Sequence, residues 1–325
     1  MDSYLKLAYE AGRKFASDNS LFSISNEKPL SQGNKNRVIR GYYNNKPVIL
    51  KFYTDLLKPN SFKRKSTESL FLRHAAASGV VPELVFESDN FILIEEITGY
   101  SLEQKFSQFN LNFNNWLSRT AINIGSAHAC LANLLVSQEI FSNFDNLCSY
   151  GKTLEQNIND ILETSLIICK EVEGFHDLLN TIDYIYKYLG EILNQPRIIY
   201  KYDNNLGNTI VNNRGFQRFI DFEECYEGTK AIYLGAVFDC LHQIPWNQPA
   251  DKLTIRQSLP WEYIKQGYEL YTKEPISSSL LEQIIAMAMF NAWFRIKRTW
   301  KANLDMSFWS PRFCKRLETY WDMIA

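Results

Sequence analysis

Glycine and histidine are scarce in this chain of 325 residues, with 14 glycines and 4 histidines, and several common signals are missing. The six cysteines form no Cys-x-x-Cys pair and lack a histidine at matching spacing, so we do not expect zinc ligation and favour a reducing compartment. A net charge of −1 removes the electrostatic argument for nucleic acid or an anionic membrane as the main partner. No apolar run approaches the length of a membrane span, and the first residues lack the apolar core of a signal peptide. We therefore expect a cytoplasmic protein with neither a nucleic-acid nor a membrane partner.

The most informative segment spans residues 197 to 223, where polar side chains follow short apolar runs. An apolar strand leads into a polar loop that carries Asp203 and Asn208. A turn ending near Gly215 reverses the chain, and a further strand delivers Asp221. Two carboxylates and one amide should therefore meet at one edge of a small sheet. Phosphoryl transfer needs such a set, because a carboxylate deprotonates the attacking hydroxyl and oxygen ligands hold magnesium on the phosphates.

A lone lysine, Lys51, lies in the β-branched and aromatic run of residues 46 to 53, which predicts a strand with one cation directed inward. Residues 61 to 78 then have helical spacing and end before Gly79, a suitable C-terminal cap. Glu68 lies in this helix. Taken singly, Lys51 could be a surface lysine and Glu68 a solvated helix residue. The order of the two elements, a strand with Lys51 followed by a helix with Glu68, favours an ion pair between these residues.

In order and context, Asp203, Asn208 and Asp221 resemble the catalytic core of the aminoglycoside phosphotransferase and choline kinase superfamily, small-molecule kinases distantly related to protein kinases. The family pattern is His-Gly-Asp-x-x-x-x-Asn followed by a hydrophobic-Asp-aromatic segment, and the resemblance covers most of the chain. It implies that Asp203 is the catalytic base and that Asn208 and Asp221 bind Mg²⁺. It also implies that Lys51, paired with Glu68, holds the α- and β-phosphates of ATP.

The resemblance implies two further contacts with the nucleotide. Backbone amides near Ser31, Gly33 and Asn34 would cover the phosphates, although this loop has one glycine where protein kinases have three and is equally typical of a hairpin turn. Backbone groups near Glu95 and Ile97 would bind the adenine. A plain charged linker is the alternative there.

The implied fold is α+β and protein-kinase-like, with two lobes. Residues 1–97 would form a small N-terminal lobe, an antiparallel β-sheet with one main helix that binds the nucleotide. Residues 98–325 would form a larger helix-rich lobe with the catalytic loop and the acceptor site. Spacing and caps predict its later helices near residues 152–170, 176–194, 229–243, 258–273, 279–302 and 310–324, the last with Ser310 as cap and Pro311 in its first turn. His128, in an earlier helix, is expected to be a packed core histidine.

Two places depart from the family pattern. Lys201 and Tyr202 stand where relatives have His-Gly before the catalytic aspartate. Lys201 could replace the histidine by reaching the backbone or a carboxylate behind the loop, or it could depress the basicity of Asp203 and reduce activity. Tyr202 adds bulk that would narrow the acceptor pocket. Beyond Gly228, the aspartate that usually follows is displaced, and Asp239 is the nearest candidate.

The identity of the acceptor stays open at this point. Glu223, Glu224 and Glu227 would form an acidic rim for an amine-bearing acceptor, or only a solvated loop. The tryptophans of the helical lobe are expected in the core more than in a cation cage. The favoured function is ATP-dependent transfer of the γ-phosphoryl group to a hydroxyl of a small polar metabolite or aminoglycoside-like compound. The alternatives are a nucleotide-binding pseudokinase and a helical interaction protein without catalysis.

Overall fold

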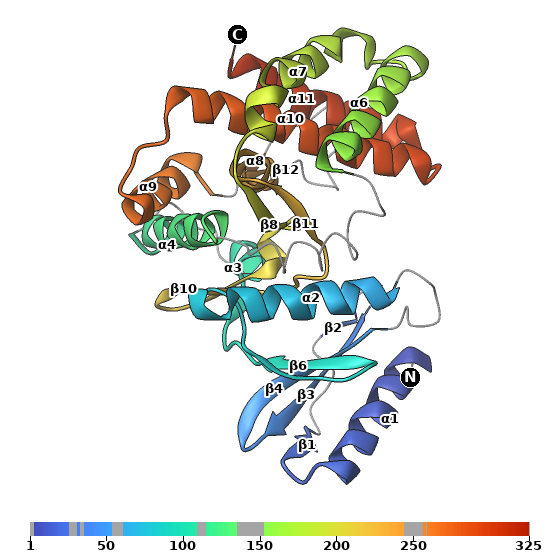
Figure 1. Ribbon diagram of the computed structural model, residues 1–325, viewed down its shortest axis with the longest axis vertical. Coiled ribbons are helices and arrows are strands. Elements are labelled where there is room, and N and C mark those ends of the chain that lie inside the picture. The colour runs from blue at the N-terminus through green and yellow to red at the C-terminus, as the bar shows by residue number, and fades with distance from the viewer. Residues whose placement is uncertain are drawn as a thin grey trace.

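The computed structural model describes residues 3–25, 31–32, 36–53, 61–108, 115–134, 153–243, 256–257 and 259–324. Figure 1 shows an N-terminal region built on a β-sheet and a helix-rich C-terminal region, with helix α2 (Ser61–Ala75) lying between them. The predicted α+β, protein-kinase-like class is therefore confirmed. The predicted division of the chain near Ile97 stays a prediction.

The N-terminal sheet is antiparallel, with strand order β1-β3-β4-β6-β5 and with β2 paired to β3. Asn44 and Asn45 join β3 to β4 and both adopt positive φ, 50° and 61°, as a two-residue hairpin with the natural strand twist requires. The strands are β1 (Phe22–Ile24), β2 (Ser31–Gln32), β3 (Asn36–Tyr43), β4 (Lys46–Tyr53), β5 (Leu84–Glu87) and β6 (Phe91–Glu95).

Helix α1 (Ser3–Asp18) packs beside this sheet, and the sequence analysis did not predict it. Leu5 and Ala8 recur at helical spacing and share a small core with Leu50 and Leu93 of the sheet. Helix α2 lies toward the other region and contributes to the larger core of the C-terminal region. The sheet is thus covered by helices from two distant parts of the chain.

Two small sheets carry the polar loops of the C-terminal region. One has the order β10-β9-β7, and the other is the antiparallel pair of β8 and β11. Gly99 precedes β7 with a φ of 154°, and a Cβ atom there would collide with the carbonyl of Val211 on β9. The strands are β7 (Tyr100–Ser101), β8 (Arg197–Lys201), β9 (Thr209–Asn212), β10 (Gly215–Phe219) and β11 (Cys225–Thr229), with a short pair β12 (His242–Gln243) and β13 (Arg256–Gln257) further on.

Helix α10 (Ser278–Lys301) is the centre of the helical core. Its middle, residues 283 to 293, is buried on every side, and the helix packs against α6, α7, α8 and α11. Thr153 begins α6 with a full capping box to Gln156. The helices are α3 (Leu102–Gln108), α4 (Asn115–Ala132), α6 (Leu154–Glu171), α7 (Leu179–Leu193), α8 (Lys230–Leu241), α9 (Trp261–Thr272) and α11 (Met306–Asp322).

Several predicted helix boundaries are wrong, and the helix predicted from residue 258, for example, begins at Trp261. The last helix begins at Met306, because the side chain of Asp305 caps it by accepting a hydrogen bond from Ser307 N at 2.9 Å. Pro311 therefore lies inside the helix, where it removes a single backbone donor. The helix predicted to reach residue 243 ends at Leu241, and residues 242–243 pair as a strand instead.

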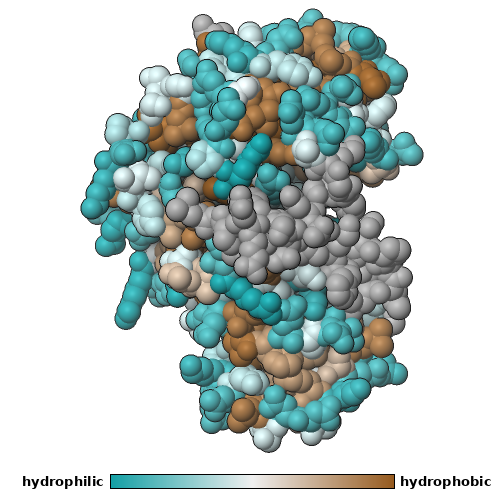
Figure 2. Space-filling view, in the orientation of Figure 1, coloured by the Kyte–Doolittle hydropathy of each residue, from teal (hydrophilic) through white to brown (hydrophobic). Residues whose placement is uncertain are grey.

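On the face shown in Figure 2, hydrophobic side chains form separate patches among hydrophilic ones over both regions. Within the part of the chain that the structure describes, no helix is both long and apolar enough to cross a membrane.

Candidate active site

Lys51 lies where the N-terminal sheet meets helix α2. Its side chain is buried on β4, and Nζ lies 2.7 Å from Oε2 of Glu68 on α2. The same Nζ donates to Oδ1 of Asp221 and lies 3.8 Å from Oε2 of Glu223. The predicted contact between Lys51 and Glu68 is therefore present, and carboxylates from distant segments surround one ammonium.

The electrostatic balance at this cluster keeps the lysine charged. Burial by itself lowers the pKa of Lys51, but the charges of Asp221, Glu68 and Glu223 outweigh burial and raise the pKa above its ordinary value. Tyr53, two residues further along β4, donates its hydroxyl to the same Glu68 oxygen. Sequence reasoning missed Tyr53, although side chains two apart on a strand share a face.

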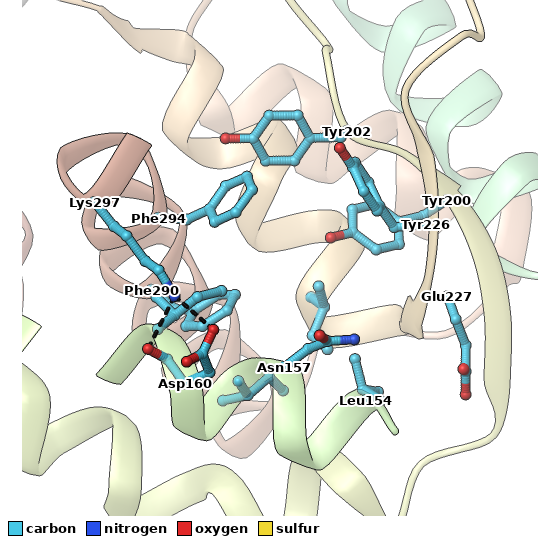
Figure 3. Close-up of a pocket in the computed structure, with 13 residues that line it drawn as sticks. Leu154, Asn157, Asp160, Tyr200, Tyr202, Tyr226, Glu227, Phe290, Phe294 and Lys297 are labelled. Carbon is cyan, nitrogen blue, oxygen red and sulfur yellow. Dashed lines mark hydrogen bonds and ion pairs between the residues drawn. The ribbon is translucent and has the colours of Figure 1, made fainter. Parts of the chain in front are cut away.

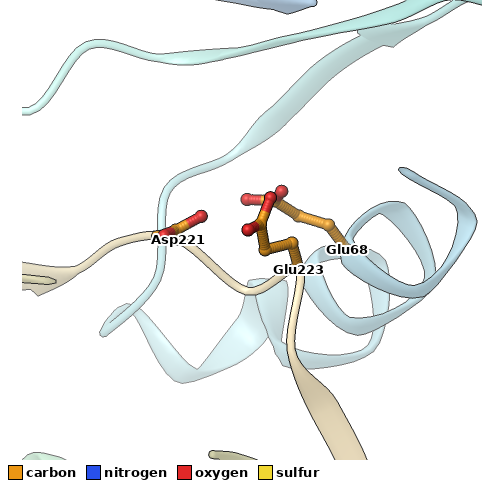
Figure 4. A group of neighbouring side chains, drawn as sticks. All are labelled: Glu68, Asp221 and Glu223. Atoms are coloured by element: carbon orange, nitrogen blue, oxygen red, sulfur yellow. The ribbon is translucent and has the colours of Figure 1, made fainter. Parts of the chain in front are cut away.

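Figure 4 shows the side chains of Glu68, Asp221 and Glu223 directed toward one another, from α2 and from the loop between β10 and β11. One ligand oxygen from each lies within 4.8 Å of the others. Carboxylate oxygens are the hard ligands that Mg²⁺ prefers, usually together with phosphate oxygens and water. This donor set therefore fits the metal. It contains Asp221 together with Glu68 and Glu223, and the metal roles of Asp221 and Asn208 stay predictions.

The Asp221 segment has an unusual backbone that a buried lysine supports. Asp221 has a φ of 64°, in the left-handed region where non-glycine residues are uncommon. Oε1 of Glu68 accepts a hydrogen bond from the next amide, Phe222 N, at 3.1 Å. Nζ of Lys201 donates to the carbonyls of Ile220, at 2.8 Å, and of Asp221, at 2.5 Å. Both sides of the turn are thus held by charged groups.

Lys201 is buried, with 1% of its surface exposed, and its Nζ lies 5.0 Å from the centre of the Phe222 ring. The sequence left two roles open for Lys201: to replace the family histidine behind the loop, or to depress the basicity of Asp203. The contacts observed for its ammonium are with backbone carbonyls. Its charge also affects His128 of α4, whose pKa falls to about 3 because of burial first and Lys201 second. His128 shares a 2.7 Å hydrogen bond with the Tyr233 hydroxyl and is the core histidine that was expected.

Asp203 lies in the loop between β8 and β9, and amide side chains orient its carboxylate. Asn205 Nδ2 donates to Oδ1 at 2.8 Å, and Asn208 Nδ2 donates to Oδ2 at 3.2 Å. Asn205 also caps the short 3-10 helix Leu206–Asn208 through the Asn208 amide at 3.0 Å. Asn205 was missed by sequence reasoning. The sequence signal that could have identified Asn205 is an asparagine just before a turn, where its side chain can accept a hydrogen bond from the turn's backbone.

The other predicted nucleotide contacts are described only in part. Ser31 pairs with Val38 in the sheet, whereas Gly33 and Asn34 lie outside the described residues. At the end of β6, the amide of Glu95 donates to the carbonyl of Glu83 at 2.9 Å. The next amide, of residue 96, donates to the carbonyl of residue 47 at 3.2 Å. The segment before Ile97 is therefore tied to the sheet.

The acids after Asp221 do not form one rim. Glu223 faces Lys51, while Glu224 lies 3.5 Å from a guanidinium nitrogen of Arg298. Glu227 lies 3.6 Å from Nε of Arg197. Each of these carboxylates has a basic neighbour, so the expected acidic rim is replaced by separate ion pairs.

Asp239, the displaced aspartate, lies fully buried in α8. Its carboxylate accepts from the Tyr320 hydroxyl at 2.7 Å and from Asn291 Nδ2 at 2.6 Å. Arg295 and Arg316 lie 3.2 Å and 3.4 Å from its oxygens. These contacts join α8 to α10 and α11, which is a structural role in the helical core.

A cavity of about 270 Å³ lies in the C-terminal region beside the residue that precedes Asp203. Figure 3 shows aromatic rings from two strands and from α10 around it, with α6 forming the opposite wall. Its lining consists of Leu154, Asn157, Ile158, Asp160, Ile161, Tyr200, Tyr202, Tyr226, Glu227, Ile232, Phe290, Phe294 and Lys297. Tyr202 lines this cavity, and whether its bulk narrows an acceptor site stays a prediction.

No protein-family profile and no curated protein matches the chain. Solved structures do match it over nearly their whole length. A GDP complex of an aminoglycoside 2′-phosphotransferase mutant has a TM-score of 0.65 at 14% identity, with 98% of each chain covered. An ADP-bound aminoglycoside phosphotransferase has a TM-score of 0.61 at 15% identity, again with 98% of each chain covered. An ethanolamine kinase of Plasmodium vivax has a TM-score of 0.61 at 13% identity, covering 99% of this chain and 95% of its own.

The chain thus has the fold of these aminoglycoside phosphotransferase and ethanolamine kinase structures, in agreement with the predicted fold. At these identities the likeness concerns the fold. The roles of the individual residues depend on the contacts described above.

Proposed function

We propose that the protein is a small-molecule kinase that transfers the γ-phosphoryl group of ATP to a hydroxyl of a small acceptor. The observation that carries this proposal is the convergence of Lys51, Glu68 and Asp221 beside a loop in which amides hold the Asp203 carboxylate. Residues from a strand, a helix and two loops meet there, which chance motif matches do not explain. Structures of the same fold carry ADP or GDP, which supports a nucleotide site.

Each polar group has a proposed task. Asp203 accepts the proton of the acceptor hydroxyl, whose oxygen forms a bond to the γ-phosphorus while the bond to the bridging oxygen of ADP breaks. Lys51 has three N–H groups, of which Glu68 and Asp221 take two, and the third is assigned to a phosphate oxygen. We assign the adenine to the Ile97 amide, because the Glu95 and Glu96 amides donate to the sheet.

Mg²⁺ would be held by Asp221 and Asn208, with Glu223 as a further oxygen donor. Asn208 donates through Nδ2 to Asp203, so Oδ1 is the atom that it can offer to a metal. When bound, the metal neutralises charge on the phosphate oxygens. The loop amides at Ser31, Gly33 and Asn34 stay a prediction for covering the phosphates.

The test separates chemistry from nucleotide binding. Asp203→Ala should lower turnover by roughly two to four decades, the usual contribution of a positioned base. The affinity for Mg·ATP, measured by calorimetry, should change less than about threefold, because Asp203 has no proposed contact with ATP. Asp183→Ala, at an exposed position on α7, is the matched control and should change neither quantity. Parallel loss of ATP binding in Asp203→Ala would assign Asp203 another role.

A nucleotide-binding pseudokinase is the second candidate, and the departure at Lys201 and Tyr202 motivates it. It predicts Mg·ATP binding by the wild-type protein without phosphoryl transfer to any member of a metabolite pool. A helical interaction protein would show no stabilisation by Mg·ATP in a thermal-shift measurement. These two readouts therefore distinguish the three functions.

A further inference from the structure

The cavity is lined by Tyr202, the residue that precedes the proposed base. Tyr200 and Tyr202 both line it, whereas Lys201 between them points the other way, toward the Asp221 turn. Asp203 is the next residue along the chain, so its backbone lies one Cα–Cα step, about 3.8 Å, from a residue of the cavity wall. Because the cavity wall includes the residue next to Asp203, the cavity is the candidate binding site for an acceptor.

The walls of the cavity are mainly hydrocarbon. The Tyr202 ring lies perpendicular to the Phe294 ring, with centroids 5.1 Å apart, and meets the Tyr226 ring edge-on at 5.7 Å. Leucine and isoleucine side chains of α6 and α8 complete the lining. At about 270 Å³ the cavity lies at the small end of the range for small-molecule pockets, which suits a compact ring more than an extended oligosaccharide. Such a wall favours a ligand with an apolar body over a ligand that is polar on all sides.

The charged groups of the lining are already balanced. Lys297 Nζ lies 2.8 Å from Oδ2 of Asp160 across the floor of the cavity, as Figure 3 shows, and also donates to the Asp160 carbonyl at 2.9 Å. Glu227 has Arg197 as its neighbour at 3.6 Å. The described wall therefore offers no surplus of negative charge, and a ligand with several positive charges would lose hydration without gaining matching carboxylates.

We propose that this cavity seats the acceptor, and that the acceptor is an alcohol with a compact, largely apolar ring body and at most one positive charge. The reacting hydroxyl of this molecule faces Asp203, the residue that follows Tyr202 of the wall. The inference rests on the proposed kinase function and narrows its substrate class. It separates this chain from an enzyme for polycationic sugars or for a small acyclic amino alcohol.

The first experiment measures binding with four probes in the presence of a non-hydrolysable Mg·ATP analogue. The probes are 2-phenylethanol, phenylalaninol, ethanolamine and gentamicin, and binding is followed by ligand-observed NMR and thermal shift. We expect the two ring alcohols to bind and to stimulate ADP formation from ATP, with ethanolamine and gentamicin at least tenfold weaker. Tighter binding of ethanolamine or gentamicin, or no binding of the ring alcohols, overturns the proposal.

The second experiment locates the binding. Ile161→Phe on α6 fills the cavity and should weaken the ring alcohols at least tenfold, with Mg·ATP affinity within twofold of wild type. Ile167→Phe, the same change at an exposed position of α6, is the control and should have no effect. Equal binding of the ring alcohols to Ile161→Phe overturns the assignment to this cavity.

Asn157→Phe keeps the test decisive if Ile161→Phe does not fold. It fills the cavity from a half-buried position of α6, so the affinity for the ring alcohols should fall at least tenfold. Unchanged affinity contradicts the assignment to this cavity. Binding of Mg·ATP is measured separately in every variant. Its absence from the wild type would refute the kinase function, whereas ring-alcohol binding reports on the cavity alone.

Discussion

Replacing Lys201 by methionine would leave two partly buried carbonyl groups without their donor. Methionine preserves the length and most of the volume of the side chain, so the change removes the ammonium and its contacts with Ile220 O and Asp221 O. Hydrogen bonds to charged groups contribute about 1.5–3 kcal/mol each, which gives roughly 3–6 kcal/mol for the pair. Removing a buried ammonium also recovers part of its desolvation cost. We expect a net loss of about 2–4 kcal/mol in the free energy of unfolding.

The same substitution should disturb the proposed metal site. Asp221 depends on a left-handed backbone conformation that Lys201 supports from behind, and its side chain contacts Lys51 in front. Without the ammonium, the turn can relax, so Lys201→Met should weaken Mg·ATP binding as well as stability. Lys201→His restores the residue of the family pattern and supplies one ring N–H. It should keep turnover within about tenfold, or roughly 1.4 kcal/mol of barrier.

Urea unfolding followed by tryptophan fluorescence gives the stability, and calorimetry gives the Mg·ATP affinity. Lys170→Met, at an exposed position of α6, is the control and should stay within about 0.5 kcal/mol of wild type. A Lys201→Met protein as stable as this control would refute the structural role. A gain of several decades in turnover for Lys201→His would show that Lys201 silences the site, in favour of the pseudokinase.

Two further predictions concern the metal and the pH dependence of stability. Asp221→Asn removes a charge from the cluster around Lys51 and should abolish Mg²⁺-dependent ATP binding. The far-ultraviolet circular dichroism should stay unchanged. Unaltered Mg·ATP affinity would exclude Asp221 as a ligand. His128 has a folded-state pKa of about 3 against an ordinary value of 6.5, so its contribution to stability is present above pH 6.5 and is lost as the pH falls toward 3. Between pH 7 and pH 5 this loss is about 2 kcal/mol, and His128→Gln should lack it in urea unfolding at the two pH values. Equal pH slopes for the two proteins would contradict a histidine that is buried and neutral.

Local patterns in the sequence were sufficient for much of the framework. The strand with Lys51, the helix with Glu68 and the loop with Asp203 were predicted, because alternation, helical spacing and turn residues act over a few neighbouring positions. The hairpin at residues 44 and 45 follows from asparagine's tolerance of positive φ. The order of these elements was also enough to predict the fold, which the similar structures confirm. Helix α1 was missed, although its apolar spacing was visible.

Contacts between distant segments needed the tertiary structure. Lys51 and Asp221 are 170 residues apart, and the contact of Lys201 with two carbonyls depends on how a turn is folded against a strand. Glu223 and Tyr53 join the same cluster without any motif. The cavity combines residues from 154 to 297 on two strands and several helices, so its apolar character is spread too widely for any local pattern to show. By itself the sequence determined which polar groups are available for the candidate site. Packing decided which of them meet, because burial and pairing of charges depend on neighbours that the chain brings together only when it folds.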